Sequence, residues 1–303
     1  MSSTTNFNNN PLIAFSEKSA DIVANIGKSI VAINGQRFPC SGIYWREGLI
    51  VTSQESLKRT EGITITLPDG ETAPVTLLGK DASTDIAVFQ TEASLPIAPI
   101  DSECELKVGH LAIAVGRDSN RGLSIAQGVV STVGGSWRSS LGGYIDRFIR
   151  LDLNFYPGGG SASINAAGQV VGFNTTGPRR SILTIPAVTV DRVVNQLLET
   201  GHIDRGYLGL SMQPVFSTSL VDELSLKSDR GLIVINVESQ SPAQSAGIIL
   251  GDILVAIEDT PIKRLRDIQA YLQPQNVGKT IKIGLIRAGK LKDVSLTIGD
   301  SGK

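Results

Sequence analysis

The sequence contains few of the residues on which many protein sites depend. Its 303 residues include only two cysteines and two histidines, and aromatic residues make up 5% of the chain. Two cysteines are too few for a disulfide framework, so the simplest interpretation is a protein of a reducing compartment. Nothing in the pattern predicts a metal site or a bound cofactor.

Charge and hydropathy exclude two further classes of partner. The formal net charge of −1 gives no long-range attraction for nucleic acid or for acidic membranes. No apolar run approaches the roughly 18 residues of a membrane-spanning helix. The polar N-terminal stretch MSSTTNFNNNPLIAF lacks the basic region and apolar region of a secretory signal. We therefore expect a cytoplasmic protein that binds neither nucleic acid nor membrane.

What the chain does contain is typical of a globular protein with two domains. Hydrophobic residues make up 41% and charged residues 19%, and 303 residues can bury two cores. Short β-type runs separated by turn signals predict an all-β barrel or sandwich in the first two thirds of the chain. The runs are SIVAI (29–33), LIVT (49–52), ITITL (63–67), DIAVF (85–89) and LAIAVG (111–116).

Helices and a polar linker divide the chain. We expect a helix at about 15–26 and another at about 187–200, which Gly201 ends. A second unit then alternates strands with a short helix after Ser241-Pro242 and a helix at about 265–273. The expected division is a flexible N-terminal segment 1–14, a β domain 15–200, a linker 201–206 and a small mixed domain 207–303.

Four blocks in the first domain, followed by a tail of matching type, resemble the HtrA (high-temperature-requirement) family of trypsin-like serine proteases with a PDZ domain. The blocks are SGIYWREGLIVTSQESL, LLGKDASTDIAVFQTE, LKVGHLAIAVGRD and ILTIPAVTVDRVVNQLLETGHIDRGYLGL. The resemblance covers about residues 15–300. It implies a mainly β fold, with two six-stranded barrels of the trypsin-like type followed by an α+β PDZ domain.

The family's chemistry uses a serine nucleophile, a histidine base and an aspartate that orients the base. Matching Thr52 to the family's threonine places Glu55 at the histidine position, and Asp85 keeps the aspartate. A carboxylate with an ordinary pKa of about 4.3 is a poor base for a serine at neutral pH. Like-charge repulsion between the two acids should also raise the pKa of one of them. Alternatively, Glu55 points to solvent or pairs with Lys58 or Arg59.

The stretch LDLNFYPGGGSASINAAGQVVGFN (151–174) has the form of the family's nucleophile loop without its serine. One count places Gly160 at the nucleophile position and another places Gly159 there, so the loop is one residue short. Ser161 holds the position by neither count. The alternative is a plain flexible turn between strands. The first count starts from Asp152 and Pro157, and the second from Asn165 and Gly168.

No other residue supplies the missing groups. His110 lies at a strand entry and His202 in the linker, and both are expected at the surface. A thiol nucleophile at Cys40 would lack a histidine to activate it, so a small buried side chain is the better interpretation. Two of the three triad members are therefore expected to be absent.

The second domain keeps the motifs of a peptide-binding module. PDZ domains add a peptide C-terminus as a strand to a sheet edge, and backbone N–H groups receive its carboxylate. Ile268 and Leu272, four apart on a helix, are expected to line the groove, with core packing as the alternative. The residues that match the family's carboxylate loop are Tyr207, Leu208, Gly209 and Leu210.

The sequence therefore predicts a catalytically inactive HtrA-like protein that binds peptide C-termini or unfolded segments, as a scaffold, chaperone-like holder or regulator. One alternative is an unconventional serine endopeptidase that uses Ser161 with Glu55 and acts on misfolded proteins. A second is an inactive subunit that regulates active HtrA-type proteases. The resemblance also implies homotrimers held by N-terminal segments, with Phe7 or Phe15 as an apolar anchor.

Overall fold

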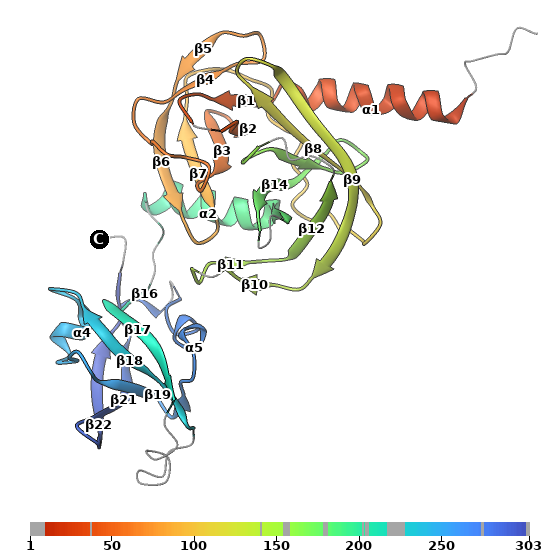
Figure 1. The fold of residues 1–303 in the computed structure, drawn as a ribbon. Coiled ribbons are helices and arrows are strands. Elements are labelled where there is room, and N and C mark those ends of the chain that lie inside the picture. The colour runs from red at the N-terminus through yellow and green to blue at the C-terminus, as the bar shows by residue number, and fades with distance from the viewer. Residues whose placement is uncertain are drawn as a thin grey trace, which may run out of the picture. The chain divides into compact units, whose positions relative to one another are not determined.

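The computed structural model describes residues 10–36, 38–139, 141–153, 158–177, 181–201, 203, 206–216, 228–273 and 276–300. The chain divides into two compact units, Met1–His202 and Ile203–Lys303, drawn as a ribbon in Figure 1. Each unit is described by itself.

In its described residues, the first unit contains the five strand runs expected from the sequence, together with ten further strands and two helices. Its strands are β1 (Ile30–Ile33), β2 (Ser41–Arg46), β3 (Leu49–Ser53), β4 (Thr64–Thr66), β5 (Thr72–Pro74), β6 (Thr76–Asp81), β7 (Ile86–Gln90), β8 (Leu111–Asp118), β9 (Gly122–Gly134), β10 (Trp137–Arg138), β11 (Tyr144–Ile145), β12 (Phe148–Leu153), β13 (Ala162–Ile164), β14 (Val170–Thr176) and β15 (Ile182–Pro186). Its helices are α1 (Pro11–Gly27) and α2 (Ala187–Thr200).

The first half of this unit is an antiparallel sheet of seven strands, in the order β5-β4-β1-β2-β3-β7-β6, rather than the expected six. The extra strand arises because residues 72–81 are split at Val75 into β5 and β6. These two strands lie at opposite ends of the sheet yet adjoin in sequence, so the sheet must curl round on itself. Its core consists of Val31, Ile33, Cys40, Tyr44, Ile50, Ile63, Ile65, Val75 and Phe89.

The second half is a closed barrel of six strands in the order β12-β15-β14-β13-β8-β9. Closure leaves no free sheet edge, and alternate side chains fill the interior. The mainly β fold with two barrel halves is therefore confirmed. The core residues of this barrel are Leu106, Ala112, Val130, Ile149, Leu151, Val171 and Ile182.

Helix α1 begins earlier than the sequence suggested. Asn10 caps its first turn by accepting a hydrogen bond from the backbone N–H of Leu12 at 3.0 Å, and Pro11 suits the first helical position. Residues 11–14, which we expected in the flexible segment, are therefore helical.

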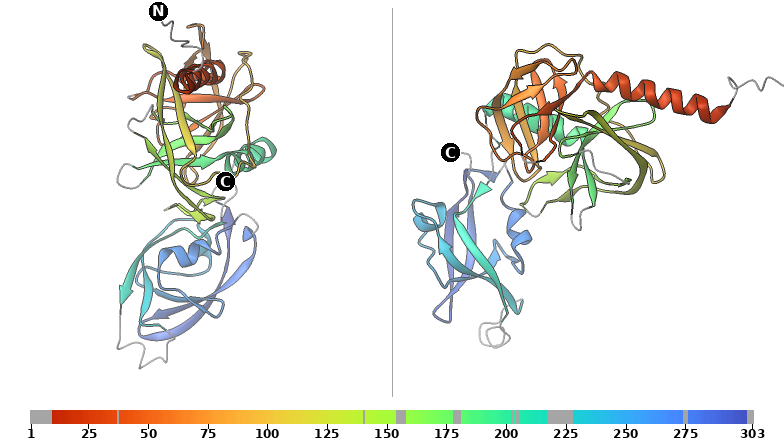
Figure 2. Two further views of the ribbon diagram at one scale, coloured as in Figure 1. Left: turned by 90° about the vertical axis from the view of Figure 1, so that its right-hand side faces the viewer. Right: turned by 45° about the horizontal axis from the view of Figure 1, so that its top comes forward.

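The C-terminal end of α1 is the part that is held. Ile26 and Gly27 are its only buried residues, and the rest of the helix projects from the barrels (Figures 1 and 2). Arg117 is 9% exposed and donates hydrogen bonds to the carbonyl oxygens of Ile30 at 2.7 Å and Gly27 at 2.9 Å. A cation in this place also suits the negative end of the helix dipole.

Helix α2 joins the two halves. It contacts β6 and β7 of the first sheet and β14 and β15 of the barrel (Figure 2). It ends where we expected, because Gly201 adopts a left-handed φ of +75° and its N–H closes the last turn.

Asp191 on α2 is the main polar anchor of this helix. Its carboxylate accepts hydrogen bonds from the Trp45 indole at 2.9 Å, the Arg46 guanidinium at 2.8 Å and the Ser102 hydroxyl. Burial alone would raise the pKa of Asp191, but the hydrogen bonds from Ser102, Trp45 and Arg46 together outweigh it and lower the pKa below its ordinary value.

The second unit is an α+β domain with one main sheet and a separate pair of short strands, β16 and β23. Its elements are β16 (Gly206–Tyr207), β17 (Leu210–Phe216), β18 (Arg230–Val237), α4 (Pro242–Ser245), β19 (Ile253–Ile257), β20 (Thr260–Pro261), α5 (Leu265–Gln269), β21 (Thr280–Arg287), β22 (Lys290–Thr297) and β23 (Gly299–Asp300). The helix expected at 265–273 is shorter, because α5 ends at Gln269.

Strand β17 forms one edge of this sheet. The strand order is β17-β18-β19-β21-β22, so among the described strands β17 pairs only with β18. Pro214 lies within β17, which is the position at a sheet edge where a missing N–H is tolerated. Helix α5 contacts β17, which leaves an unpaired strand edge beside a helix.

We expect Asp191→Asn to lower the free energy of unfolding of the first unit by about 2 kcal/mol at pH 7, because charged hydrogen bonds are lost. Since the pKa of Asp191 is depressed, its contribution is present above its ordinary value of 3.8 and is lost as pH falls through the lower folded pKa. Urea unfolding followed by tryptophan fluorescence reports this unit alone, because both tryptophans, Trp45 and Trp137, lie in it.

Glu199→Gln, at an exposed position near the end of the same helix, is the matched control and should change stability little. Equal losses in the two variants would contradict the assigned role of Asp191.

Candidate functional site

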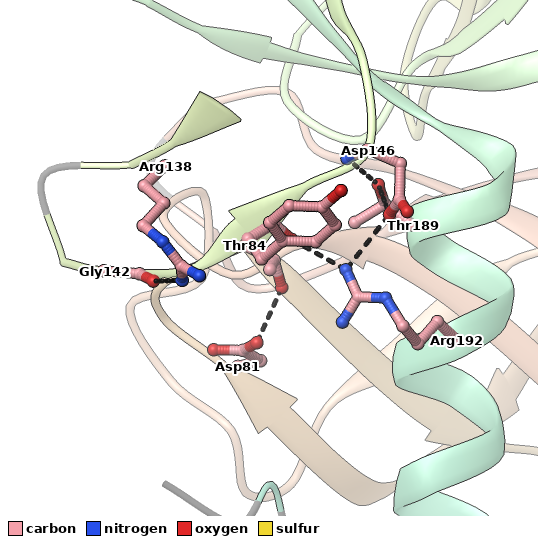
Figure 3. A network of polar contacts seen from close by, with 8 residues as sticks. Asp81, Thr84, Arg138, Gly142, Asp146, Thr189 and Arg192 are labelled. Atoms are coloured by element: carbon pink, nitrogen blue, oxygen red, sulfur yellow. Dashed lines mark hydrogen bonds and ion pairs between the residues drawn. The ribbon is translucent and has the colours of Figure 1, made fainter. Parts of the chain in front are cut away.

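The turn that precedes Asp85 is fixed by another carboxylate, that of Asp81. Asp81 accepts hydrogen bonds from the Ser83 N–H and hydroxyl, both at 2.9 Å, and from the Thr84 hydroxyl at 2.8 Å (Figure 3). The chain leaves this turn with Asp85 in the left-handed region, at φ +60°. A non-glycine residue in this conformation is uncommon and marks a site that its surroundings hold in place.

A hairpin of the second half supports the same turn. A Cβ atom on Gly143 would overlap the backbone of Ser83, so only glycine allows this close approach. The next residue, Tyr144, has the guanidinium groups of Arg138 and Arg192 each 5.5 Å from its ring centroid. Arg192 of α2 also donates to the carbonyl of Tyr144 at 2.7 Å and thereby ties the hairpin to the helix (Figure 3).

Asp85 accepts hydrogen bonds from both halves of the unit. The Ser53 hydroxyl, at the end of β3, donates to it at 2.7 Å, and the Glu55 backbone N–H, just after β3, donates at 2.6 Å. The Thr175 side chain reaches it from β14 of the barrel. Burial raises the pKa of the Asp85 carboxyl above its ordinary value; the three hydrogen bonds oppose this rise, and the negative charge of Glu55 adds to it.

Glu55 contacts Asp85 through its backbone and not through its carboxylate. Its backbone holds Asp85, but its side chain is exposed, and within the described residues its carboxylate has no hydrogen bond or ion pair. It therefore points to solvent without pairing to Lys58 or Arg59, which agrees with the simpler of the two interpretations. The expected repulsion is present, since it raises the pKa of Asp85.

The contacts of Gly159 and Gly160 indicate which of the two residues lies at the nucleophile position. Ser41 of β2 donates its N–H to the carbonyl of Gly159 at 2.9 Å, and Gly160 donates to the carbonyl of Asn174 at 3.1 Å. A Cβ atom on Gly159 would point at Ser53 and overlap the Ser56 hydroxyl, whereas one on Gly160 would overlap the buried carbonyl of Ser41. Gly159, not Gly160, therefore faces the Asp85 segment, which favours the second of the two counts.

Ser161 faces away from this segment. It is 0% exposed and lies at hydrogen-bond distance, 3.3 Å, from the Asn174 side-chain amide in the barrel interior. Pro157, from which the first count started, lies outside the described residues.

A cavity of about 810 Å³ lies between the two halves at this place. The hydroxyls of Ser53, at the end of β3, and of Ser56, just after it, are on its wall, and Phe38, an exposed aromatic residue, also lines it. The other lining residues are Pro39, Glu55, Lys58, Asp118, Arg121, Leu123, Ser124, Gly158, Gly159, Thr175 and Thr176.

The remaining candidates for acid, base or thiol chemistry do not reach the cavity. Cys40 is buried, and burial raises the pKa of its thiol to about 12, which makes it inert as a nucleophile and agrees with its expected structural role. His110 is exposed and accepts a hydrogen bond from the Lys107 N–H at 3.3 Å. His202 lies outside the described residues.

In the second unit, the loop before β17 contains the residues expected to receive a peptide carboxylate. Gly209 has φ +75°, and a Cβ atom there would overlap the Ser241 side chain. The carbonyls of Leu208 and Gly209 are used by Ala243 and Glu238, whereas the N–H groups of these two residues donate to no backbone carbonyl in the described part of the chain. Tyr207 donates its hydroxyl to the Glu238 carboxylate, which raises the pKa of Tyr207.

The two residues expected on the groove differ in their surroundings. Ile268 is 3% exposed and belongs to the hydrophobic core, so it offers little surface to a ligand. Leu272 lies beyond the end of α5 and is only partly buried against that core, as is Leu210 at the start of β17. Ile268 therefore packs in the core, as the alternative interpretation had it.

Sequence reasoning missed three polar residues at the candidate site: Ser53, Ser56 and Thr175. Their side chains surround Asp85 or face Gly159, and none occupies a position that the resemblance marks as catalytic. A signal was present, because two serines flank the acid of TSQES at the point where the family has its histidine.

We expect Asp85→Asn to change how stability depends on pH. The folded pKa of Asp85 is raised, so the wild-type protein should lose stability relative to the variant as pH rises from 3.8 through the raised value, and the difference should level off above it. Asparagine tolerates the left-handed conformation of this residue. Tryptophan-monitored urea unfolding between pH 3.5 and 7 measures the difference, and a constant offset across that range would contradict the assignment.

Models of two domain families match the chain. The trypsin-like peptidase domain matches residues 40–173, and the PDZ domain matches residues 206–298. Proteins named "Probable periplasmic serine endoprotease DegP-like" from Rhizobium meliloti and Chlamydia pneumoniae are each 30% identical, over 270 and 265 residues, or 86% and 85% of this chain. These alignments cover 53% and 54% of the relatives, so the chain spans about half of their length.

Solved structures agree with this likeness. A serine endoprotease from Yersinia pestis is 25% identical with a TM-score of 0.69, covering 93% of this chain and 97% of that one. The HtrA-type protease AlgW with a decapeptide has a TM-score of 0.70 over 94% of this chain and 99% of its own, and at 22% identity it shows the fold alone.

The names of the relatives contradict the cytoplasmic location expected from the sequence, because they describe periplasmic enzymes. That expectation was based on the absence of a secretory signal and of a disulfide framework, and neither absence is sufficient to assign a protein to the cytoplasm. Within the described part of the chain, no helix has the length and apolar character needed to cross a membrane.

Two barrel halves that meet at the Asp85 turn, matches to a trypsin-like peptidase domain and then a PDZ domain, and relatives that align over most of this chain lead to one assignment. The chain is a homologue of the HtrA and DegP serine proteases, with a trypsin-like peptidase domain followed by a PDZ domain.

Proposed function

We propose that this protein is a member of its family without protease activity and that it works by binding peptide ends through its PDZ domain. The observation that carries the proposal is the composition of the cavity around Asp85. The group expected to be a base is an exposed carboxylate, and the position that faces it is a glycine. A serine protease needs a histidine between its nucleophile and its aspartate, and none of the described residues that line the cavity is a histidine.

Two further features support inactivity. The alternative nucleophile, Ser161, is fully buried and turned toward Asn174, away from Glu55. In the protease mechanism, the oxyanion hole uses the N–H of the nucleophile and of the residue two positions before it. Two residues before Gly159 is Pro157, and proline has no N–H to donate.

The binding half of the proposal rests on the PDZ unit. Strand β17 has a free edge, and the loop that precedes it carries N–H groups without backbone partners in the described part of the chain. A peptide added along β17 would satisfy that edge and bring its carboxylate to the Leu208–Gly209 turn. The solved structure of AlgW with a decapeptide shows that a protein of this fold has been seen with a peptide.

We extend the proposal to unfolded segments and to active HtrA-type relatives as partners, and we place the protein in the periplasm by analogy with its relatives. A homotrimer held by N-terminal segments is also part of the proposal. Leu12, Ile13 and Phe15 of α1 are exposed, Phe15 at 49%, and a second copy of the helix would cover them. Phe7 lies outside the described residues.

The first test is proteolysis. Purified protein should not hydrolyse unfolded casein above a control without protein, because loss of one triad member costs about four to six orders of magnitude in rate. Release of acid-soluble peptides over several hours measures this. Cleavage that grows with time and disappears in Ser161→Ala would establish the unconventional endopeptidase instead.

The second test is binding of peptide C-termini by the full chain. A peptide of about five residues with an apolar last residue should bind at about micromolar Kd, and its C-terminal amide at least about tenfold more weakly, or ~1.4 kcal/mol. Fluorescence polarisation with the two peptides measures the difference.

Gly209→Ala should abolish the preference for the free acid, because its Cβ would meet Ser241 and displace the loop. The matched control is Gly247→Ala, which also has positive φ, +74°, but has no atom within 4 Å of a Cβ. Equal binding of acid and amide by the wild-type chain would remove the carboxylate loop from the proposal.

A further inference from the structure

The hydroxyl groups of Ser53 and Ser56 have no part in the proposed binding function. Ser56 donates a hydrogen bond to the Ser53 oxygen at 3.2 Å, and Ser53 donates to the Asp85 carboxylate at 2.7 Å. Ser53 is 1% exposed, whereas Ser56 is partly exposed on the cavity wall. The three residues therefore form a chain that starts at an accessible hydroxyl and ends at a carboxylate.

The accessible end of this chain stands at a particular place. A Cβ atom on Gly159 would overlap the Ser56 hydroxyl. Gly159 is the residue of the glycine loop that faces the Asp85 segment, so Ser56 presents its oxygen where a side chain at 159 would begin. The cavity thus contains a hydroxyl at the nucleophile's place, supplied by the opposite wall.

A serine hydroxyl reacts only when a base takes its proton. Ser53 can pass a proton, since its oxygen accepts from Ser56 while its own hydrogen points to Asp85. The surroundings of Asp85 strengthen it as an acceptor, because burial makes its carboxylate hold a proton more firmly than an exposed one does.

We propose that Ser56 is a nucleophile for activated aryl esters, with Ser53 as the proton relay and Asp85 as the base. In this step the Ser56 oxygen forms a bond to the acyl carbon, and the bond from that carbon to the aryl oxygen breaks. The aryl oxygen leaves with the electron pair as aryloxide. The Ser56 proton passes to Ser53 as the Ser53 proton passes to Asp85. Water later hydrolyses the acyl-serine.

Aryl esters are expected to react and peptide bonds are not, because their leaving groups differ in the need for a proton. The amine of a peptide bond must receive a proton as it departs, and the histidine that would deliver it is absent from this cavity. An aryloxide such as p-nitrophenolate is a stable anion and needs no proton. The inference therefore goes beyond the proposed binding function and is compatible with the absence of casein hydrolysis.

The test uses the full chain and p-nitrophenyl acetate. The rate of p-nitrophenolate release should fall at least about tenfold in Ser56→Ala, Ser53→Ala and Asp85→Asn. Ser131→Ala, which removes a hydroxyl from β9 outside the cavity lining, should keep the wild-type rate. The wild-type rate should also rise with pH above 3.8 as Asp85 ionises, and Ser56→Ala should lack this rise. Mass spectrometry of the quenched protein should locate the acetyl group on Ser56.

Three results would overturn the inference. The first is an unchanged rate of p-nitrophenolate release in Ser56→Ala, and the second is an acetyl group on a residue other than Ser56. The third is an unchanged rate in Asp85→Asn, because Ser56 would then react without the proposed base. Binding of the free-acid peptide should be the same in Ser56→Ala as in the wild type. Failure of the esterase and failure of the peptide-binding proposal are therefore distinguishable.

Discussion

The carboxylate of Asp85 is the group on which the candidate site depends. It accepts hydrogen bonds from Ser53 and Glu55 at the end of β3 and just after it, and from Thr175 in the barrel, so it joins the two halves at the point where they meet. Burying a charge is costly unless it is hydrogen-bonded, and these bonds offset only part of the cost, since the pKa stays raised. The turn at Asp81 fixes the segment that leads to Asp85, whose backbone has the uncommon left-handed conformation.

This dependence explains how the cavity keeps its shape with a glutamate at position 55 and a glycine at position 159. The backbone N–H of Glu55 and the hydroxyl of Ser53 hold Asp85 whatever side chain residue 55 carries. The glycine loop is likewise held by backbone bonds, from Ser41 to Gly159 and from Gly160 to Asn174. Main-chain contacts maintain the form of the site, and the side chains that remain decide its chemistry.

Much of the fold could be predicted from the sequence, and the reasons are local. The runs that became β1, β3 and β7 are continuous and apolar, and Gly201 ends α2 by a conformation that glycine adopts without strain. The split of residues 72–81 at Val75 directly follows Pro74, a residue that interrupts strand pairing, but we did not predict it from the sequence. The early start of α1 was visible in the Asn10-Pro11 pair but was outweighed by the polar composition around it.

The site was harder to predict than the fold. Counting along the loop could not choose between Gly159 and Gly160, because the choice depends on which Cβ direction faces Ser56 and which faces Ser41. Ile268 looked like a groove residue from its spacing, yet the spacing of a short helix does not tell which of its faces meets the core. Contacts between segments distant in sequence decide both questions.

The open edge of β17 has a consequence for solubility. A strand with unpaired N–H and C=O groups can join the same strand of another molecule, and long apolar edges of this kind promote aggregation. Pro214 removes one donor from the middle of β17, which interrupts a continuous ladder with an unintended partner. A short peptide that binds at the Gly209 end pairs with only part of the strand and need not reach the proline. The same edge can thus admit a chain end while resisting a full-length strand.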